Sequence, residues 1–130
     1  MSGPNWVEAD DLVQLNRLLV AHTGEPFQLR EPGLLESAVA RPRMLRHYEG
    51  EEDVVALACA LAAALTRNHP FTQGNKRTAH AALFRFLWIN GYTLDRPDDE
   101  RFADLMIALS ERAVTEADYA AAIGERVVER

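Results

Sequence analysis

The sequence lacks the features that mark secreted and membrane proteins. Its single cysteine, Cys59, cannot form an internal disulfide, and its alanine and leucine neighbours predict a small core residue rather than a nucleophile. The most apolar run, Val54 to Leu65, is shorter than the roughly 20 apolar residues that span a bilayer. No charged and then apolar leader opens the chain, so no export signal is expected. These absences predict a soluble cytoplasmic protein that does not enter a membrane.

Positive charge is also scarce. The chain carries 14 Lys and Arg residues against 20 Asp and Glu residues, for a formal net charge of -6. Nucleic-acid-binding surfaces normally show a basic patch, so no nucleic-acid partner is expected. Lysine is especially rare, because Lys76 is the only one and every other basic residue is arginine. The 4 histidines lack the one-turn spacing of paired metal ligands, and a zinc site is therefore not expected.

What the sequence has in quantity is apolar residues with helical spacing. Hydrophobic residues fill 48% of the 130 positions, enough for the core of one domain over residues 1–130. Apolar spacing and stop signals predict an all-α fold, a compact bundle of about six helices around a central buried pair. The expected helices are Ala9 to Thr23-Gly24, Pro32 to about Arg41, about Asp53 to Asn68, Asn75 or Lys76 to Asn90-Gly91, Asp98 to Arg112, and a last helix from the capping box at Thr115. Pro42 should end the second helix, leaving Arg43 to Glu49 as a short hairpin or flap before the third.

The stretch from His69 to Thr78 interrupts this pattern with polar and charged side chains between two apolar segments. Such side chains are costly in a core without partners, so the stretch should lie at its edge. Pro70 disfavours helical geometry at the residue before it. One helix is therefore expected to end at His69, and the next to begin near Asn75.

A helix that starts with these residues has the parts of a phosphate site. Helix N-termini attract anions, and Gly74 lets a phosphate approach the backbone closely. Lys76 and Arg77 add positive charge, and His69 could take a proton from a hydroxyl near neutral pH. Together they suggest transfer from a phosphate donor to a hydroxyl. On spacing alone we favour a plainer interpretation, in which Asn75 caps the helix, the cations are solvated and the histidine holds backbone together.

The order of the residues adds information that spacing does not. The run His69-Pro-Phe-x-x-Gly-Asn-Lys-Arg-Thr-Ala79 resembles the signature of the Fic/Doc superfamily, and lysine after asparagine is similar to its Doc (death on curing) branch. Leu29 to Pro42 is similar to the segment before the flap in this family, and Asn90-Gly91-Tyr92 follows the motif helix as it does there. The resemblance covers nearly the whole chain and implies a Fic/Doc-type (Fido) helical fold.

The resemblance implies a role for each residue of the motif. His69 is expected to be the base that activates the target hydroxyl, and Phe71 an anchor in the core. The residues expected to bind nucleotide phosphates are Gly74, Asn75, Lys76 and Arg77. In the Doc branch, lysine at the position of Lys76 implies that the terminal phosphate of ATP is transferred. The resemblance therefore implies a Doc-type toxin, which is a kinase that phosphorylates a threonine of translation elongation factor Tu and so inhibits translation.

One position departs from the family pattern. Gln73 stands where the family has Asp or Glu to hold Mg²⁺ against the nucleotide. Magnesium is usually held by carboxylates, and a neutral amide supplies no charge, so Gln73 is expected to be a weak metal ligand. Two alternatives therefore stay open: a catalytically impaired Doc-fold pseudoenzyme that binds a partner, and an enzyme that transfers AMP to proteins.

A separate inhibitor is also expected. Self-inhibited Fic proteins resemble one another in a short helix of the pattern Ser/Thr-x-x-x-Glu-Gly/Asn, which this sequence does not contain. The resemblance then implies a cognate antitoxin with a segment that folds on binding. The expected partners are thus an antitoxin and a protein substrate.

Overall fold

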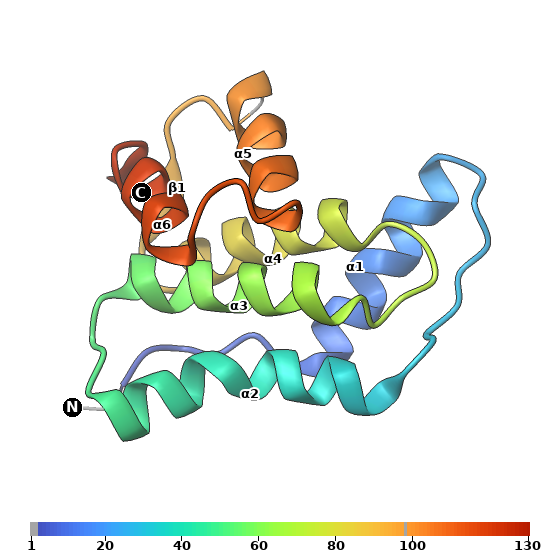
Figure 1. Ribbon diagram of the computed structural model, residues 1–130, viewed down its shortest axis with the longest axis horizontal. Coiled ribbons are helices and arrows are strands. Elements are labelled where there is room, and N and C mark those ends of the chain that lie inside the picture. Colours follow the sequence, from blue (N-terminus) through green and yellow to red (C-terminus); the bar gives the residue numbers. More distant parts are fainter. Residues whose placement is uncertain (1–2, 98) are drawn as a thin grey trace.

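The fold is built mostly from helices that surround one apolar core (Figure 1). The computed structural model describes residues 3–97 and 99–130, and within them lie six helices and two short strands. In chain order these are α1 (Ala9–His22), α2 (Pro32–Glu49), α3 (Val54–Asn68), α4 (Asn75–Ile89), β1 (Tyr92–Leu94), α5 (Glu100–Ser110), α6 (Glu116–Gly124) and β2 (Val127–Glu129). The helical fold predicted from the sequence is confirmed.

The central helix is α3, which packs against α2 and α4 and also contacts α5 and α6 (Figure 1). Every residue from Leu57 to Thr66 is buried, and half of these residues are alanine. Alanine favours helix, and its small side chain lets neighbouring helices approach closely. Cys59 is fully buried, and burial raises the pKa of its thiol, as expected of a core residue.

The ends of α3 lie where the sequence predicts them. At its start, the carboxylate of Asp53 accepts a hydrogen bond from the N–H of Val55 at 3.0 Å. The helix ends at Asn68, because His69 adopts the left-handed conformation (φ 48°) and Pro70 follows it. Local signals therefore determine where the polar loop begins.

The second helix is longer than predicted. It continues through Pro42, so both the expected end at Arg41 and the expected flap at Arg43 to Glu49 are wrong. Proline removes one helical hydrogen bond, but Pro42 is itself buried on the same face of α2 as Val39. Burial of that face outweighs the local cost, and α2 ends only before Gly50, which is left-handed (φ 70°).

An extended segment does lie against the loop between α3 and α4, but it comes from the connection between α1 and α2. Residues 28–30 run antiparallel to residues 70–72. The N–H of Arg30, for example, donates to the carbonyl of Pro70 at 2.8 Å. This connection therefore covers the side of the loop.

The two C-terminal helices lie over α3. The last one, α6, begins at the predicted capping box, with Thr115 as its N-cap. The fifth helix spans Glu100–Ser110 and ends before the predicted Arg112. Its predicted start at Asp98 lies outside the described residues.

The two strands form a small antiparallel sheet. The extended segment predicted after Gly91 is confirmed as β1, whereas β2 was not predicted. Leu94 pairs with Val127 and Tyr92 with Glu129. The sheet thereby ties the end of the chain to the segment that follows α4.

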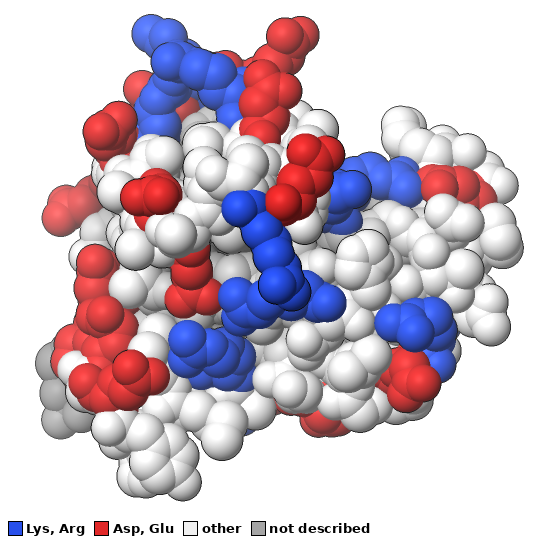
Figure 2. Space-filling view, viewed as in Figure 1, with Lys and Arg blue, Asp and Glu red and all other residues white. Residues whose placement is uncertain are grey.

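Charges of both signs share the surface. On the face shown in Figure 2, basic side chains cross the middle beside acidic ones, and acidic side chains gather where α2 ends and α3 begins. Four of the five residues from 49 to 53 are Glu or Asp, which accounts for this gathering. No helix within residues 3–97 and 99–130 combines the length and the apolar character needed to cross a bilayer.

Candidate functional site

The loop between α3 and α4, residues 69–74, is bent at both ends. His69 (φ 48°) ends α3 and Gly74 (φ 76°) begins α4, both in the left-handed conformation. Between them Phe71 is buried, and its ring lies against that of Phe27 with centroids 6.3 Å apart. Figure 1 shows the loop at one end of the helix pair, where α3 turns into α4.

Asn75 closes this loop from inside. Its Oδ1 accepts from the N–H of Phe71 at 3.0 Å, and its Nδ2 donates to the carbonyl of the same residue at 2.7 Å. The same Nδ2 lies 3.3 Å from Nδ1 of His69. Asn75 is 7% exposed and its side-chain amide is bonded to Phe71, so only its backbone N–H is left for an anion.

Arg30 holds the backbone of His69 from the other side. Its Nε and Nη2 donate to the carbonyl oxygen of His69 at 3.1 and 2.7 Å. This carbonyl follows the last turn of α3, where carbonyls lack helical partners. The His69 side chain is exposed, so its imidazole is accessible while its backbone is fixed.

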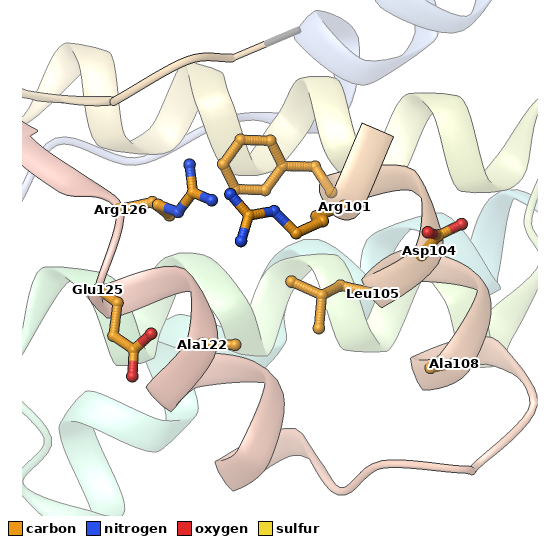
Figure 3. A pocket seen from close by; sticks show the side chains of 8 residues that line it. Arg101, Asp104, Leu105, Ala108, Ala122, Glu125 and Arg126 are labelled. Atoms are coloured by element: carbon orange, nitrogen blue, oxygen red, sulfur yellow. The ribbon is translucent and has the colours of Figure 1, made fainter. Parts of the chain in front are cut away.

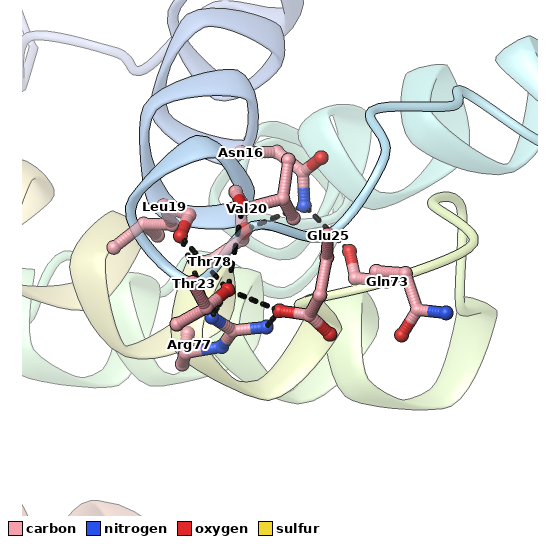
Figure 4. A network of polar contacts seen from close by, with 8 residues as sticks. All are labelled: Asn16, Leu19, Val20, Thr23, Glu25, Gln73, Arg77 and Thr78. Carbon is pink, nitrogen blue, oxygen red and sulfur yellow. Dashed lines mark hydrogen bonds and ion pairs between the residues drawn. The ribbon is translucent and has the colours of Figure 1, made fainter.

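Arg77 is engaged by the end of α1 and the turn after it (Figure 4). Its guanidinium forms an ion pair with Glu25 at 2.5 Å and donates to the hydroxyl of Thr23 at 3.0 Å. That hydroxyl also bonds to the Glu25 carboxylate. The cation predicted to bind phosphate thus has a carboxylate partner within the protein.

Asn16 joins α1 to the loop before α4 and to the first turn of that helix (Figure 4). It is fully buried, and its Nδ2 donates to the carbonyl of Gln73 at 2.8 Å and to the hydroxyl of Thr78 at 3.0 Å. A buried amide with two such bonds stabilises one conformation of the loop, because breaking them would leave buried polar groups unpaired.

Gly74 is required by this packing as well as by its backbone conformation. A Cβ there would lie 3.1 Å from Val20 and 3.2 Å from Asn16. Gly74→Ala is therefore expected to lower the free energy of unfolding by about 2 to 3 kcal/mol. Gly24 is the matched control, because it has the same φ of 76° but nothing within 4 Å of its Cβ position.

Gly24→Ala is expected to cost only the backbone strain, about 1 kcal/mol. Urea unfolding of both variants measures the difference. Equal losses would show that the contact with α1 does not constrain the loop.

The ion pair with Arg77 also gives a pH-dependent contribution to stability. Hydrogen bonds from the hydroxyl of Thr23 and from Arg77 lower the pKa of Glu25 below its ordinary value of 4.5. A carboxyl whose pKa is lower in the folded chain stabilises the fold above its unfolded pKa. It loses that contribution as the pH falls through its folded pKa.

Glu25→Gln is therefore expected to lower the Tm at neutral pH, with a difference from wild type that shrinks in acid below pH 4.5. Thermal unfolding across this range measures it. Glu36→Gln, at an exposed position of α2, is the control and should show little difference at any pH. A Glu25→Gln difference that persists unchanged in acid would contradict the ion pair as its cause.

Lys76 is the exposed cation of the motif. Among the described residues no ion pair engages it, in contrast to Arg77 beside it. It lies at a cavity of about 560 Å³ between α4 and α5. His80 lines the same cavity, and burial lowers the pKa of its imidazole, so this ring is neutral at pH 7. Apolar side chains form much of the remaining lining, among them Leu19, Phe102, Met106 and Ile107, and Asp99 and Glu100 line its α5 side.

The position expected to hold Mg²⁺ offers little to a metal. Gln73 has a neutral amide, and its backbone carbonyl is bound to Asn16. The carboxylate that reaches this end of α4, Glu25, is paired with Arg77. Within residues 3–97 and 99–130, no group of three His, Cys, Asp or Glu side chains is placed to hold a metal ion. These residues do not fit a carboxylate-held Mg²⁺.

A second cavity, of about 430 Å³, lies between α5 and α6 (Figure 3). Arg101 and Arg126 line it, and both form ion pairs with Asp99, at 3.1 and 3.2 Å. Asp99 is the N-cap of α5, so these charges fasten α5 to the chain before β2. None of the described residues that line this cavity belongs to the predicted site.

The structure thus gathers residues that sequence reasoning missed. They are Asn16, Thr23, Glu25 and Arg30, all from α1 and the connection after it. Asn16 had a signal, because it is a polar residue four positions from both Leu12 and Val20 on the buried face of α1. The other three had none, because their partners lie 39 to 54 positions away in the chain.

Known proteins share both the motif and the surrounding chain. The pattern described as the Fic/DOC family matches residues 6–87. The chain is 41% identical over 95 residues to Toxin Doc of Mycolicibacterium smegmatis, with 72% of each protein covered. It is 25% identical over 114 residues to Protein kinase doc of Escherichia phage P1, with 88% of this chain and 89% of that protein covered. This chain belongs to the Fic/DOC family.

Proposed function

We propose that residues 1–130 form one Fic/Doc domain that acts as a Doc-type toxin and transfers the terminal phosphate of ATP to a protein hydroxyl. One observation carries the proposal: an exposed imidazole, His69, and an exposed lysine, Lys76, flank one short loop at a helix N-terminus. The name Toxin Doc of one relative supports a toxin, and the name Protein kinase doc of the other supports phosphate transfer. The proposed target is a threonine of elongation factor Tu, whose phosphorylation would inhibit translation.

In the proposed reaction the oxygen of the target hydroxyl attacks the terminal phosphorus of ATP. The new oxygen–phosphorus bond forms as the bond to the β-phosphate oxygen breaks, and ADP leaves. His69 takes the proton of the attacking hydroxyl. Lys76 and the N–H groups of the first turn of α4 offset the negative charge on the phosphates. Arg77 is bound to Glu25 and orients this turn.

The cavity beside Lys76 supports a nucleotide as the donor. Its volume of about 560 Å³ lies within the usual range of small-molecule sites, roughly 300 to 1,000 Å³. Its apolar lining suits a base, while the lysine at its edge suits phosphates. ATP is therefore the cofactor that we propose.

Magnesium has no step in this proposal. Gln73 supplies no charge to a metal, so the charge that offsets the phosphates comes from Lys76 and the helix terminus. Losing a metal lowers the rate of phosphoryl transfer. Gln73 is thus the one observation that favours a second candidate, a Doc-fold protein that binds a partner without turnover.

The proposal also includes a partner and a place. A cognate antitoxin, with a segment that folds on binding, is the proposed inhibitor, and the name Toxin Doc of a relative supports this pairing. The reaction would take place in the cytoplasm, where ATP and elongation factor Tu are found.

Transfer of label from ATP tests the proposal. The purified chain is incubated with elongation factor Tu and ATP labelled at either the terminal or the α phosphate. Label from the terminal phosphate is expected on the factor. Label from the α phosphate would show that the chain transfers AMP and not phosphate. No label from either position would favour the candidate without turnover.

A further inference from the structure

The orientation of the Asn75 amide is determined by the backbone of Phe71. Oδ1 accepts from the N–H of that residue at 3.0 Å, and Nδ2 donates to its carbonyl at 2.7 Å. If the amide were rotated by half a turn, its oxygen would face the carbonyl oxygen of Phe71 and its NH₂ group would face the N–H of Phe71. Because Asn75 is only 7% exposed, water does not compensate such a reversal. The nitrogen of the amide therefore faces the carbonyl of Phe71.

This orientation has a consequence for His69. The same Nδ2 lies 3.3 Å from Nδ1 of the imidazole. An amide NH₂ group has two hydrogens and cannot accept a hydrogen bond. One hydrogen goes to the carbonyl of Phe71, which leaves the other for the ring. Nδ1 must then present its lone pair, since a proton on it would face the N–H of Asn75.

We propose that Asn75 sets the tautomer of His69, so that the neutral ring carries its proton on Nε2 in the free protein. The nitrogen away from Asn75 then donates a hydrogen bond and cannot take up a proton. The consequence of this tautomer for catalysis rests on the proposed function. His69 acts as a base only after the ring turns about its Cβ–Cγ bond, or after its proton moves to Nδ1 and the contact with Asn75 is lost.

This gives the free protein a resting form. Water that contacts the exposed ring meets an N–H and is not activated for attack on a bound phosphate. Arg30 holds the backbone of His69, so the change needs only the side chain to move. Asn75 is thus a positioning residue that acts through the histidine.

Nitrogen NMR of the histidine rings tests this inference without any activity. The full chain is labelled with ¹⁵N and measured at about pH 8.5, where imidazoles are neutral. His69 is assigned by the loss of its signals in His69→Ala. Its spectrum is expected to show the Nε2–H form alone. The exposed His22 and His47 are the internal reference and should show mixtures of the two forms.

Two substitutions sharpen the test. Asn75→Asp is expected to shift His69 toward the Nδ1–H form, because a carboxylate accepts where the amide donates. Asn75→Ala should give the mixture that His47 shows. Backbone spectra away from the loop show whether each variant is folded. If neither variant folds, the wild-type spectrum alone decides which tautomer His69 adopts.

A wild-type His69 with its proton on Nδ1, or with the same mixture as His47, would overturn the inference. The proposed function fails separately, when no label is transferred from ATP, and that result leaves the tautomer measurement unaffected.

Discussion

His69→Ala is expected to lower the rate of phosphate transfer by about 10² to 10⁴, the usual contribution of a general base. The fold should be unaffected, because the side chain is exposed and its backbone is held by Arg30. In cells that express the chain without an antitoxin, the variant should no longer slow growth. Initial rates with labelled ATP and growth curves measure the two effects.

His47→Ala is the matched control for this substitution. His47 is also exposed but lies near the C-terminal end of α2, away from the loop. It should transfer phosphate and slow growth as the wild type does. If His69→Ala keeps the wild-type rate while remaining folded, the imidazole is not the base.

Gln73→Asp is expected to make phosphate transfer respond to Mg²⁺, with a gain of at least about tenfold when the metal is present. The new carboxylate would supply the charge that the wild-type loop lacks. Without Mg²⁺ the same change should weaken ATP binding, because the carboxylate then repels the phosphates. Calorimetry measures ATP binding and labelled ATP measures the transfer rate, each with and without Mg²⁺.

Gln73→Asn separates charge from size. It has the shape of aspartate but keeps a neutral amide, so it should show no response to Mg²⁺ beyond that of the wild type. The explanation from charge fails if Gln73→Asn and Gln73→Asp respond alike.

Local signals in the sequence predicted much of the fold. The ends of α3 follow from Asp53, His69 and Pro70, each of which acts on its own stretch of backbone. Pro42 shows where such reasoning fails. Its local tendency to end a helix was outweighed by burial against the core, which depends on residues far away in the chain.

The candidate site was also predicted only in part. The sequence predicted that a helix would begin near Asn75, and α4 does, with Lys76 in its first turn. It did not predict that Arg77 would be bound to Glu25, or that Asn75 would turn inward to Phe71. Those contacts depend on how α1 and the loop pack together, and no periodicity or spacing encodes them.

The proposed function requires nucleotide phosphates to bind at the first turn of α4. Titration of the ¹⁵N-labelled chain with ATP, followed by backbone amide shifts, tests it most directly. We expect saturable shifts that are largest at Gly74, Asn75, Lys76 and Arg77. Shifts that are largest at Arg101 and Arg126, in the cavity between α5 and α6, or the absence of any saturable shift, would contradict it.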